Sequence, residues 1–258
     1  MPDPATVAQW VLESKSITGV PALALHDIAK RERIRVRHNK YHDEPDFCGE
    51  LLFKGDARAI LINTAYGPRT RHTFTFAHEL GHHFLKHGPT YTQDEASGIL
   101  CTVADLRDRK GIRAIEREAN AFAAALLMPE SLFRLQILGA PFDFDLINNL
   151  ARDFHVSKQS CCFRILDFIQ LPCAVIYSEG LTITAQKSSL AAGNAVIRHR
   201  AMPPGTIAHS VICEKRRQAG FVQSDPAKWL LKYSAGTSLY ECTRGHFEHG
   251  VAMTLLRW

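Results

Sequence analysis

A cluster of four histidines and one glutamate within fourteen residues constrains the fold of this chain more than any other feature. The stretch FTFAHELGHHFLKH, residues 74–87, has helical spacing and is followed by Gly88-Pro89, which is a helix stop signal. Within it, His78, Glu79 and His82 form the pattern H-E-x-x-H. Residues four apart share one face of a helix, so both imidazoles can bind one ion while Glu79 points toward a water molecule on that ion. The pattern predicts a metal site on a helix.

A catalytic zinc site has three protein ligands and one open position, and imidazole suits zinc. The third ligand must come from another part of the chain, because the third histidine of the metzincin motif is absent. The next strong helix, expected at residues 112–127, offers Glu116 and Glu118. We favour Glu116, which lines up with small alanine side chains that permit close helix approach, and with Asn120, which could orient an imidazole. Glu118 remains the alternative.

Seven cysteines are scattered along the chain without a C-x-x-C pair, a pattern typical of free thiols in a reducing compartment. We expect Cys101 within a polar, flexible loop at about residues 89–110, between the two helices that carry the metal ligands. Because thiolate binds zinc tightly, Cys101 is a candidate inhibitory zinc ligand that would exclude water from the open position. The alternative is a buried free thiol. We expect His83 and His87 at the surface or the rim of the site.

The composition is that of a soluble globular protein, with 258 residues of which 46% are hydrophobic and 22% charged. There is no run of about 18 apolar residues that could span a bilayer. The N-terminal stretch lacks the basic and apolar regions of a secretory signal, so we expect a cytoplasmic protein without membrane contact. The net charge of +5 is mild. Arg33, Arg35 and Arg37 alternate with Ile34 and Val36, which predicts a half-buried strand with a basic open face, either solvated or in contact with nucleic acid.

The other elements are predicted from periodicity and turn residues. Two extended segments, at 50–54 and 57–63, flank the turn Lys54-Gly55-Asp56, and an extended peptide substrate could pair with residues 58–64. Helices are expected at 6–14, 130–137 and 226–233, and two more within 146–168. Short strands follow residue 172, with a hairpin turn at Glu179-Gly180.

Two motifs, RTRHTFTFAHELGHHFLKH and then IEREANAFAAALLMP, resemble those of the ImmA/IrrE family of bacterial zinc metallo-endopeptidases. The resemblance covers about residues 50–170. It implies an α+β fold with a compact, thermolysin-like zinc peptidase domain, and substrates that are partner repressors with helix-turn-helix DNA-binding domains. In the family, cleavage of the repressor switches on stress, mobile-element or phage-defence genes.

We expect three parts along the chain: a zinc metallopeptidase domain at 1–140, a helical, helix-turn-helix-like connector at 141–170, and a C-terminal α/β regulatory domain at 171–258. Some family members carry a GAF-like sensor domain in the last position. Because the family responds to DNA damage and phage infection, single-stranded DNA is a candidate activator, held by stacking and phosphate attraction. The aromatic and basic residues available for this are His199, Arg198, Arg200, Lys215, Arg216, Arg217, Trp229, Tyr233 and Trp258.

The resulting prediction is a cytoplasmic endopeptidase that binds Zn2+ through His78, His82 and Glu116. Zinc would lower the pKa of its bound water toward about 7, and Glu79 would take the water proton and pass it to the leaving amine. The alternative is a non-proteolytic DNA-binding regulator with a structural zinc, which needs no acid or base beside the metal and uses four protein ligands. A small-molecule sensor with a degenerate peptidase is disfavoured by the intact motif.

Overall fold

The computed structural model describes residues 3–93, 96–106, 113–197, 199–218 and 220–258. Across these residues the fold is α+β, with eight α-helices and two five-stranded sheets. The chain divides into two compact units. The first unit consists of Met1–Leu135 and Asn148–Ser160, and the second of Gln136–Ile147 and Cys161–Trp258. None of the helices in the described ranges is long and apolar enough to cross a lipid bilayer.

The sheet of the first unit contains five strands in the order β1-β3-β2-β5-β4. Only the pair β1–β3 is parallel, and the other neighbours are antiparallel. The strands are β1 Ile34–Asn39, β2 Phe47–Lys54, β3 Ala57–Asn63, β4 Tyr91–Gln93 and β5 Ala96–Thr102. Since β1 and β2 occupy both edges of β3, a peptide substrate cannot pair with residues 58–64, and that expectation is wrong.

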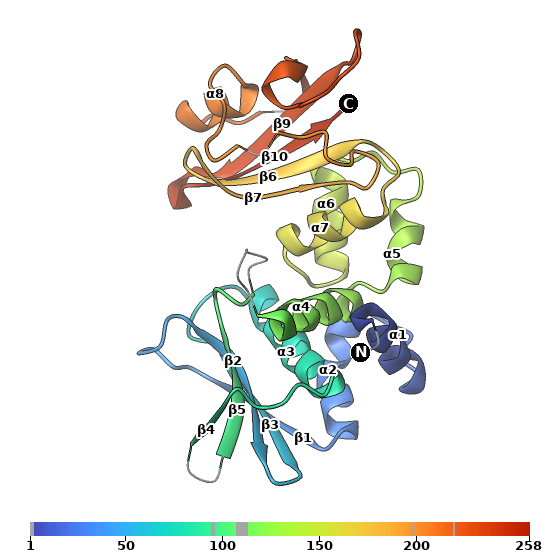
Figure 1. Cartoon of the computed structure of the whole chain (residues 1–258), viewed down its shortest axis with the longest axis vertical. Helices are drawn as coiled ribbons and strands as arrows, with labels where there is room; N and C mark the ends of the chain where they lie inside the picture. Colours follow the sequence, from blue (N-terminus) through green and yellow to red (C-terminus); the bar gives the residue numbers. More distant parts are fainter. Residues whose placement is uncertain (1–2, 94–95, 107–112, 198, 219) are drawn as a thin grey trace. The chain divides into compact units, whose positions relative to one another are not determined.

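Helices cover one face of this sheet (Figure 1). The reason lies in strand alternation: Leu51, Ile60, Ile62 and Ile99 point to that face and are fully buried. Helix α3 lies against β2 and β3, and α4 packs against α3 and α1. The helices are α1 Pro4–Ser14, α2 Pro21–Arg31, α3 Arg69–Phe84, α4 Ala114–Leu127 and α5 Glu130–Ile137. The apolar face of the sheet therefore supports the helix that carries the H-E-x-x-H motif.

The segment that was expected to be a flexible loop at 89–110 contains two strands instead. Residues 94–95 and 107–110 of that segment lie outside the described part of the chain, but β4 and β5 pair with each other, and β5 pairs with β2. Cys101 belongs to β5, opposite Gly49 of β2, and is fully buried. The polar composition predicted a loop, but pairing with distant parts of the chain orders this segment as strands.

The second unit contains a five-stranded sheet in the order β7-β6-β10-β9-β8, with antiparallel neighbours throughout. The predicted hairpin is present, with Gly180 at φ +54° between β6 and β7. The predicted helix at 226–233 is wrong, because only the short 3-10 turn Pro226–Lys228 forms before Trp229 enters the core. The elements are α6 Phe144–Asp153, α7 Lys158–Phe168, β6 Cys173–Glu179, β7 Thr182–Ser188, α8 Ile207–Cys213, β8 Val222–Ser224, β9 Leu239–His246 and β10 Val251–Arg257, with α5, α6 and α7 shared between the units.

A buried carboxylate organises the core of the second unit. Glu241 of β9 is fully buried and accepts hydrogen bonds from Trp229 Nε1 at 2.6 Å, from the Ala208 backbone N–H at 2.9 Å and from the Ser224 hydroxyl. These donors come from three separate segments, so the carboxylate fixes the start of α8 and the Trp229 ring to the sheet. A buried charge is tolerated when it is fully hydrogen-bonded.

Candidate metal centre

Close approach of α3 and α4 creates the candidate centre. Gly81 of α3 makes that approach feasible, because a Cβ atom built there would lie 3.2 Å from the Cα and carbonyl oxygen of Ala119 and 3.1 Å from Phe122 Cδ1. Those distances are shorter than ordinary van der Waals contacts. The small residue inside H-E-L-G-H therefore allows a carboxylate on α4 to reach the imidazoles on α3.

Three side chains converge at this crossing. The Nε2 atoms of His78 and His82 are 3.0 Å apart, and Glu116 Oε2 lies 3.1 Å from the first and 3.3 Å from the second. All three side chains are fully buried. Glu118 does not join them, since its carboxylate faces His87 instead. The structure thus brings Glu116, rather than Glu118, to the two histidines.

The tautomer of His78 follows from its neighbours. Asn120 uses its amide NH2 group to donate to the Asp105 carbonyl at 2.7 Å, so its Oδ1 faces His78 Nδ1 at 2.9 Å. Nδ1 of His78 must therefore carry a proton, which it donates to Asn120. In the neutral ring, Nε2 then has only a lone pair to direct at the centre. This is the arrangement that a metal-binding imidazole requires.

His82 is oriented by a longer relay. Its Nδ1 lies 2.8 Å from Nδ1 of His87, and His87 Nε2 lies 3.0 Å from Glu118 Oε2. When His87 donates to Glu118, its Nδ1 accepts the proton of His82 Nδ1, and His82 Nε2 also presents a lone pair to the centre. His87 is buried, so its expected place at the surface or rim is wrong. His83 does lie nearer the surface, 3.1 Å from Glu32.

The end of α3 explains how a residue only five positions after His82 can turn back to it. The backbone N–H of His87 donates to the His82 carbonyl at 3.0 Å, and that of Lys86 donates to the His83 carbonyl at 3.1 Å. Lys86 has φ +57°. These are the features of a Schellman C-cap, here with lysine in the left-handed position that glycine usually takes. The sequence signal for this relay was the fourth histidine.

Two bare imidazole nitrogens and a carboxylate oxygen facing one another would repel unless a cation lies between them, and this donor set fits Zn2+. Burial lowers the pKa of His82 to about 4, which keeps the ring neutral near neutral pH. Burial alone would raise the pKa of Glu116, but the neighbouring His78 and His82 imidazoles bring it down to about 2. Glu116 therefore offers one negative charge, and His82 offers a neutral nitrogen ligand.

Glu79 lies beside this group and is fully buried. Neither of its carboxylate oxygens has a hydrogen-bond partner within the described residues. Burial and then the Glu116 carboxylate raise the pKa of Glu79 well above its usual value. Cys101 is one of the polar side chains nearby, and its Sγ lies within 4.8 Å of ligand atoms of His78 and Glu79. Burial and then Glu79 raise the pKa of this thiol well above its usual value.

Sequence reasoning missed the residues on β2 that border the centre. A Cβ atom at Gly49 would lie 2.5 Å from Thr75 Cγ2 and 3.3 Å from Glu79 Oε1, so only glycine fits between β2 and the Glu79 carboxylate. On the next residue, Glu50, the carboxylate accepts a hydrogen bond from the Tyr91 hydroxyl. The Tyr91 hydroxyl therefore contacts Glu50 rather than the three ligands.

A family profile described as Peptidase_M78, IrrE N-terminal-like domain, matches residues 29–166, which include the motif on α3 and the acidic residues of α4. The chain belongs to this family. The predicted ImmA/IrrE resemblance is thereby confirmed. Peptidase_M78 is named as a peptidase family, which agrees with an H-E-x-x-H motif beside a third buried ligand.

The fold of this Peptidase_M78 member is also found in a solved structure. A Mycobacterium tuberculosis transcriptional regulator aligns over 100% of this chain and 76% of that chain, with a TM-score of 0.61 and 15% sequence identity. At that identity the likeness shows a shared fold. None of the curated proteins compared matches the chain significantly.

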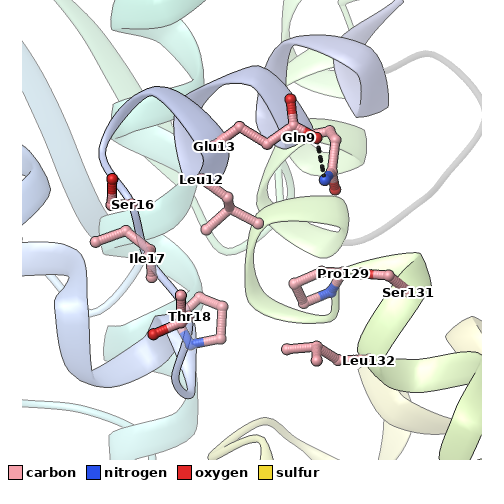
Figure 2. A pocket seen from close by; sticks show the side chains of 10 residues that line it. Gln9, Leu12, Glu13, Ser16, Ile17, Thr18, Pro129, Ser131 and Leu132 are labelled. Atoms are coloured by element: carbon pink, nitrogen blue, oxygen red, sulfur yellow. Dashed lines mark hydrogen bonds between the residues drawn. The ribbon is translucent and has the colours of Figure 1, made fainter.

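A cavity of about 500 Å³ lies elsewhere in the first unit, between α1, the connection to α2 and the start of α5 (Figure 2). Leu12, Ile17 and Leu132 are among its lining residues, and Gln9 and Glu13 form a 2.7 Å hydrogen bond along its side. None of its lining residues belongs to the group around His78. The cavity is therefore separate from the candidate centre.

Proposed function

We propose that this chain is a zinc-dependent endopeptidase whose substrate is a partner transcriptional repressor with a helix-turn-helix domain. The observation that carries the proposal is the convergence of His78 Nε2, His82 Nε2 and Glu116 Oε2, all buried, directly beside the unpartnered carboxylate of Glu79. A structural zinc would need a fourth protein ligand and no acid or base. The unpartnered Glu79 favours catalysis over the alternative of a non-proteolytic DNA-binding regulator.

The residues have distinct roles in this proposal. His78, His82 and Glu116 hold the ion, which when bound supplies Lewis-acid chemistry that acidifies water and polarises the scissile carbonyl. Glu79 accepts the proton of the attacking water and donates it to the leaving amine. Asn120 and His87 hold the two imidazoles in the tautomers that direct Nε2 inward. Burial of the group excludes competing solvent and strengthens each of these interactions.

We propose that the chain contains three parts with different functions. Residues 1–140 would form the peptidase domain, thermolysin-like in its ligand set, and 141–170 would connect it to a regulatory, GAF-like domain at 171–258. Cys161 and Cys162 of α7 are buried, which favours a packing role for the connector over DNA reading. Cleavage of the repressor in the cytoplasm would derepress genes for stress response or phage defence.

We also propose that Cys101 holds the enzyme latent by binding the ion at its open position. Its Sγ lies within 4.8 Å of His78 and Glu79, on the side of the centre where Glu79 would activate water. Cys101 is not part of the group formed by His78, His82 and Glu116, so ligation would require its Sγ to move toward the ion. Loss of the thiolate ligand would then open the site.

Single-stranded DNA is the proposed activating ligand, and the second unit supplies the groups that would bind it. Arg200, Lys215 and Arg217 are exposed and basic, and Tyr233 is exposed by 50%. Trp229 is excluded from stacking because it is buried against Glu241. Arg198 lies outside the described residues. Phosphate attraction to these cations predicts an affinity that falls with salt.

The decisive experiment is cleavage of a helix-turn-helix repressor encoded beside the gene, with zinc and single-stranded DNA present. Glu79→Gln should reduce cleavage by about 10²- to 10⁴-fold, the usual contribution of a general base, and leave the zinc content unchanged. The exposed carboxylate of Glu13 gives a matched control, because Glu13→Gln should cleave normally. Normal cleavage by Glu79→Gln would remove Glu79 as the general base, and absence of cleavage by the wild-type protein would favour the non-proteolytic alternative.

Latency can be tested by spectroscopy independently of activity. Cobalt-substituted protein should show a thiolate-to-cobalt charge-transfer band in the absence of DNA, and Cys101→Ser should lose the band and gain basal cleavage. Cys48→Ser is the matched control, since Cys48 is a buried thiol on β2. A spectrum without the band in the wild-type protein would remove Cys101 from the metal while leaving the peptidase proposal intact.

A further inference from the structure

A second pair of histidines lies outside the candidate centre, on the surface of the first unit. His26 of α2 and His38 of β1 are both exposed, and their Nε2 atoms are 3.3 Å apart. The two residues are twelve positions apart in the chain and on different elements, so α2 packing against β1 is what brings them together. Neither imidazole has a role in the proposed peptidase reaction.

Phe76 fixes the orientation of both rings. Its ring lies edge to face with His26 at a centroid separation of 4.9 Å and with His38 at 6.1 Å. Phe76 belongs to α3 and is buried, so the two imidazoles pack against a ring that the core holds in place. Aromatic packing of this kind restricts ring rotation. The two nitrogens are therefore held toward each other rather than meeting by chance rotation of free surface side chains.

The separation matches the geometry of chelation. Zinc binds imidazole nitrogen at about 2.0–2.1 Å, and two ligands at a tetrahedral angle on such an ion are about 3.3–3.4 Å apart. The pair of His26 and His38 has this spacing without movement, and the two imidazoles of the candidate centre, His78 and His82, are comparably close at 3.0 Å. Burial and then the neighbouring His26 and His72 lower the pKa of His38, which favours the neutral, metal-binding ring.

We propose that His26 and His38 form a second metal site, which binds a divalent transition ion such as Zn2+, Ni2+ or Cu2+ with solvent in the remaining positions. Imidazole selects these ions over Mg2+ and Ca2+, which prefer oxygen ligands. With two exposed protein ligands, the site binds its ion more weakly than the three-ligand centre. The bound ion links α2 to β1 above Phe76, two residues before His78 on α3. A simple hydrogen bond between the two imidazoles is the competing explanation of the geometry.

The number of zinc ions bound per chain distinguishes the two explanations. The untagged, full-length protein is loaded with one equivalent of Zn2+ at the high-affinity centre and then titrated with further Zn2+ by calorimetry. Wild-type protein should take up a second equivalent, and His26→Asn and His38→Asn should each lose it while retaining the first. His42→Asn is the matched control, because His42 is exposed and packs on Tyr66 rather than on another imidazole.

Two further measurements protect the result against misfolding and against coincidental binding. Circular dichroism of the metal-free variants should match that of the wild type. Because there are two independent variants, a folding defect in one of them still leaves the other to test the proposal. Electron paramagnetic resonance of Cu2+ added as the second equivalent should show coupling to two nitrogens in the wild type and in His42→Asn. Absence of a second equivalent in the wild type, or its persistence in both His26→Asn and His38→Asn, would overturn the proposal.

Discussion

The Nδ1 atoms of His82 and His87 lie 2.8 Å apart, although the helix that carries His82 has already ended before His87. The backbone reverses after the helix and brings His87, the fourth histidine of the motif region, back to His82. His87 thus becomes the partner that orients this ligand. The candidate centre depends on this relationship in addition to the ligands themselves, because an imidazole with a free tautomer presents N–H to a cation as readily as a lone pair.

The first prediction concerns the residues that orient the imidazoles. His87→Ala and Asn120→Ala should each weaken Zn2+ binding by about 10- to 100-fold, because the partner of one Nδ1 is lost in each variant. The measurement is competition for zinc with a chromophoric chelator. His83→Ala is the matched control, as His83 is the adjacent histidine that contacts Glu32 instead. Equal affinities for all three variants would show that the relays do not set the tautomers.

The second prediction separates the two glutamates of α4. Glu116→Gln should lose stoichiometric zinc, because it replaces the carboxylate that lies within 3.3 Å of both imidazoles. Glu118→Gln should retain one equivalent with reduced affinity, since it acts only through His87. Metal content after dialysis against a weak chelator gives the answer. Stoichiometric zinc in Glu116→Gln would assign the third ligand to another residue.

The third prediction concerns the helix crossing. Gly81→Ala should push α4 away from α3 and so weaken zinc binding, since the added Cβ meets the Ala119 backbone at 3.2 Å. The free energy of unfolding should fall by no more than about 2 kcal/mol, because alanine gains about 1 kcal/mol of helix propensity while overpacking costs about 1–3 kcal/mol. Zinc titration and urea denaturation together test this. Gly19→Ala, with open space around it, is the control.

Local patterns were sufficient for the metal helix, for the alanine-rich helix after it and for the hairpin at Gly180. They were insufficient where contacts between distant parts of the chain determine the local structure. The helix α2 was missed although Pro21 stands at its first turn, a recognisable start signal. The segment around Cys101 was predicted as a loop because its composition is polar, yet pairing with β2 makes it a strand.

The candidate site shows the same division between local and long-range information. The spacing of His78, Glu79 and His82 is visible in the sequence because one helix carries all three. The sequence could not decide between Glu116 and Glu118, since that choice depends on the rotation of α4 against α3. Nor could it place His87, which required the reversal at Lys86. A residue with φ +57° and a bulky side chain gives no reliable sequence signal.

The fourth prediction is a pH dependence of stability that arises from Glu32. Burial alone would raise its pKa, but hydrogen bonds from Lys15 at 2.5 Å and from His83 at 3.1 Å outweigh burial and lower it. A lowered pKa means that the folded protein favours the carboxylate, so the stabilisation is complete above the usual pKa near 4.5 and is lost as pH falls below it. Glu32→Gln should therefore reduce the free energy of unfolding by up to about 1 kcal/mol near neutral pH. The difference from wild type should shrink in acid. Urea denaturation of metal-free protein across this range measures it, with Glu179→Gln, at an exposed position, as control. A difference that stays constant with pH would contradict the assignment.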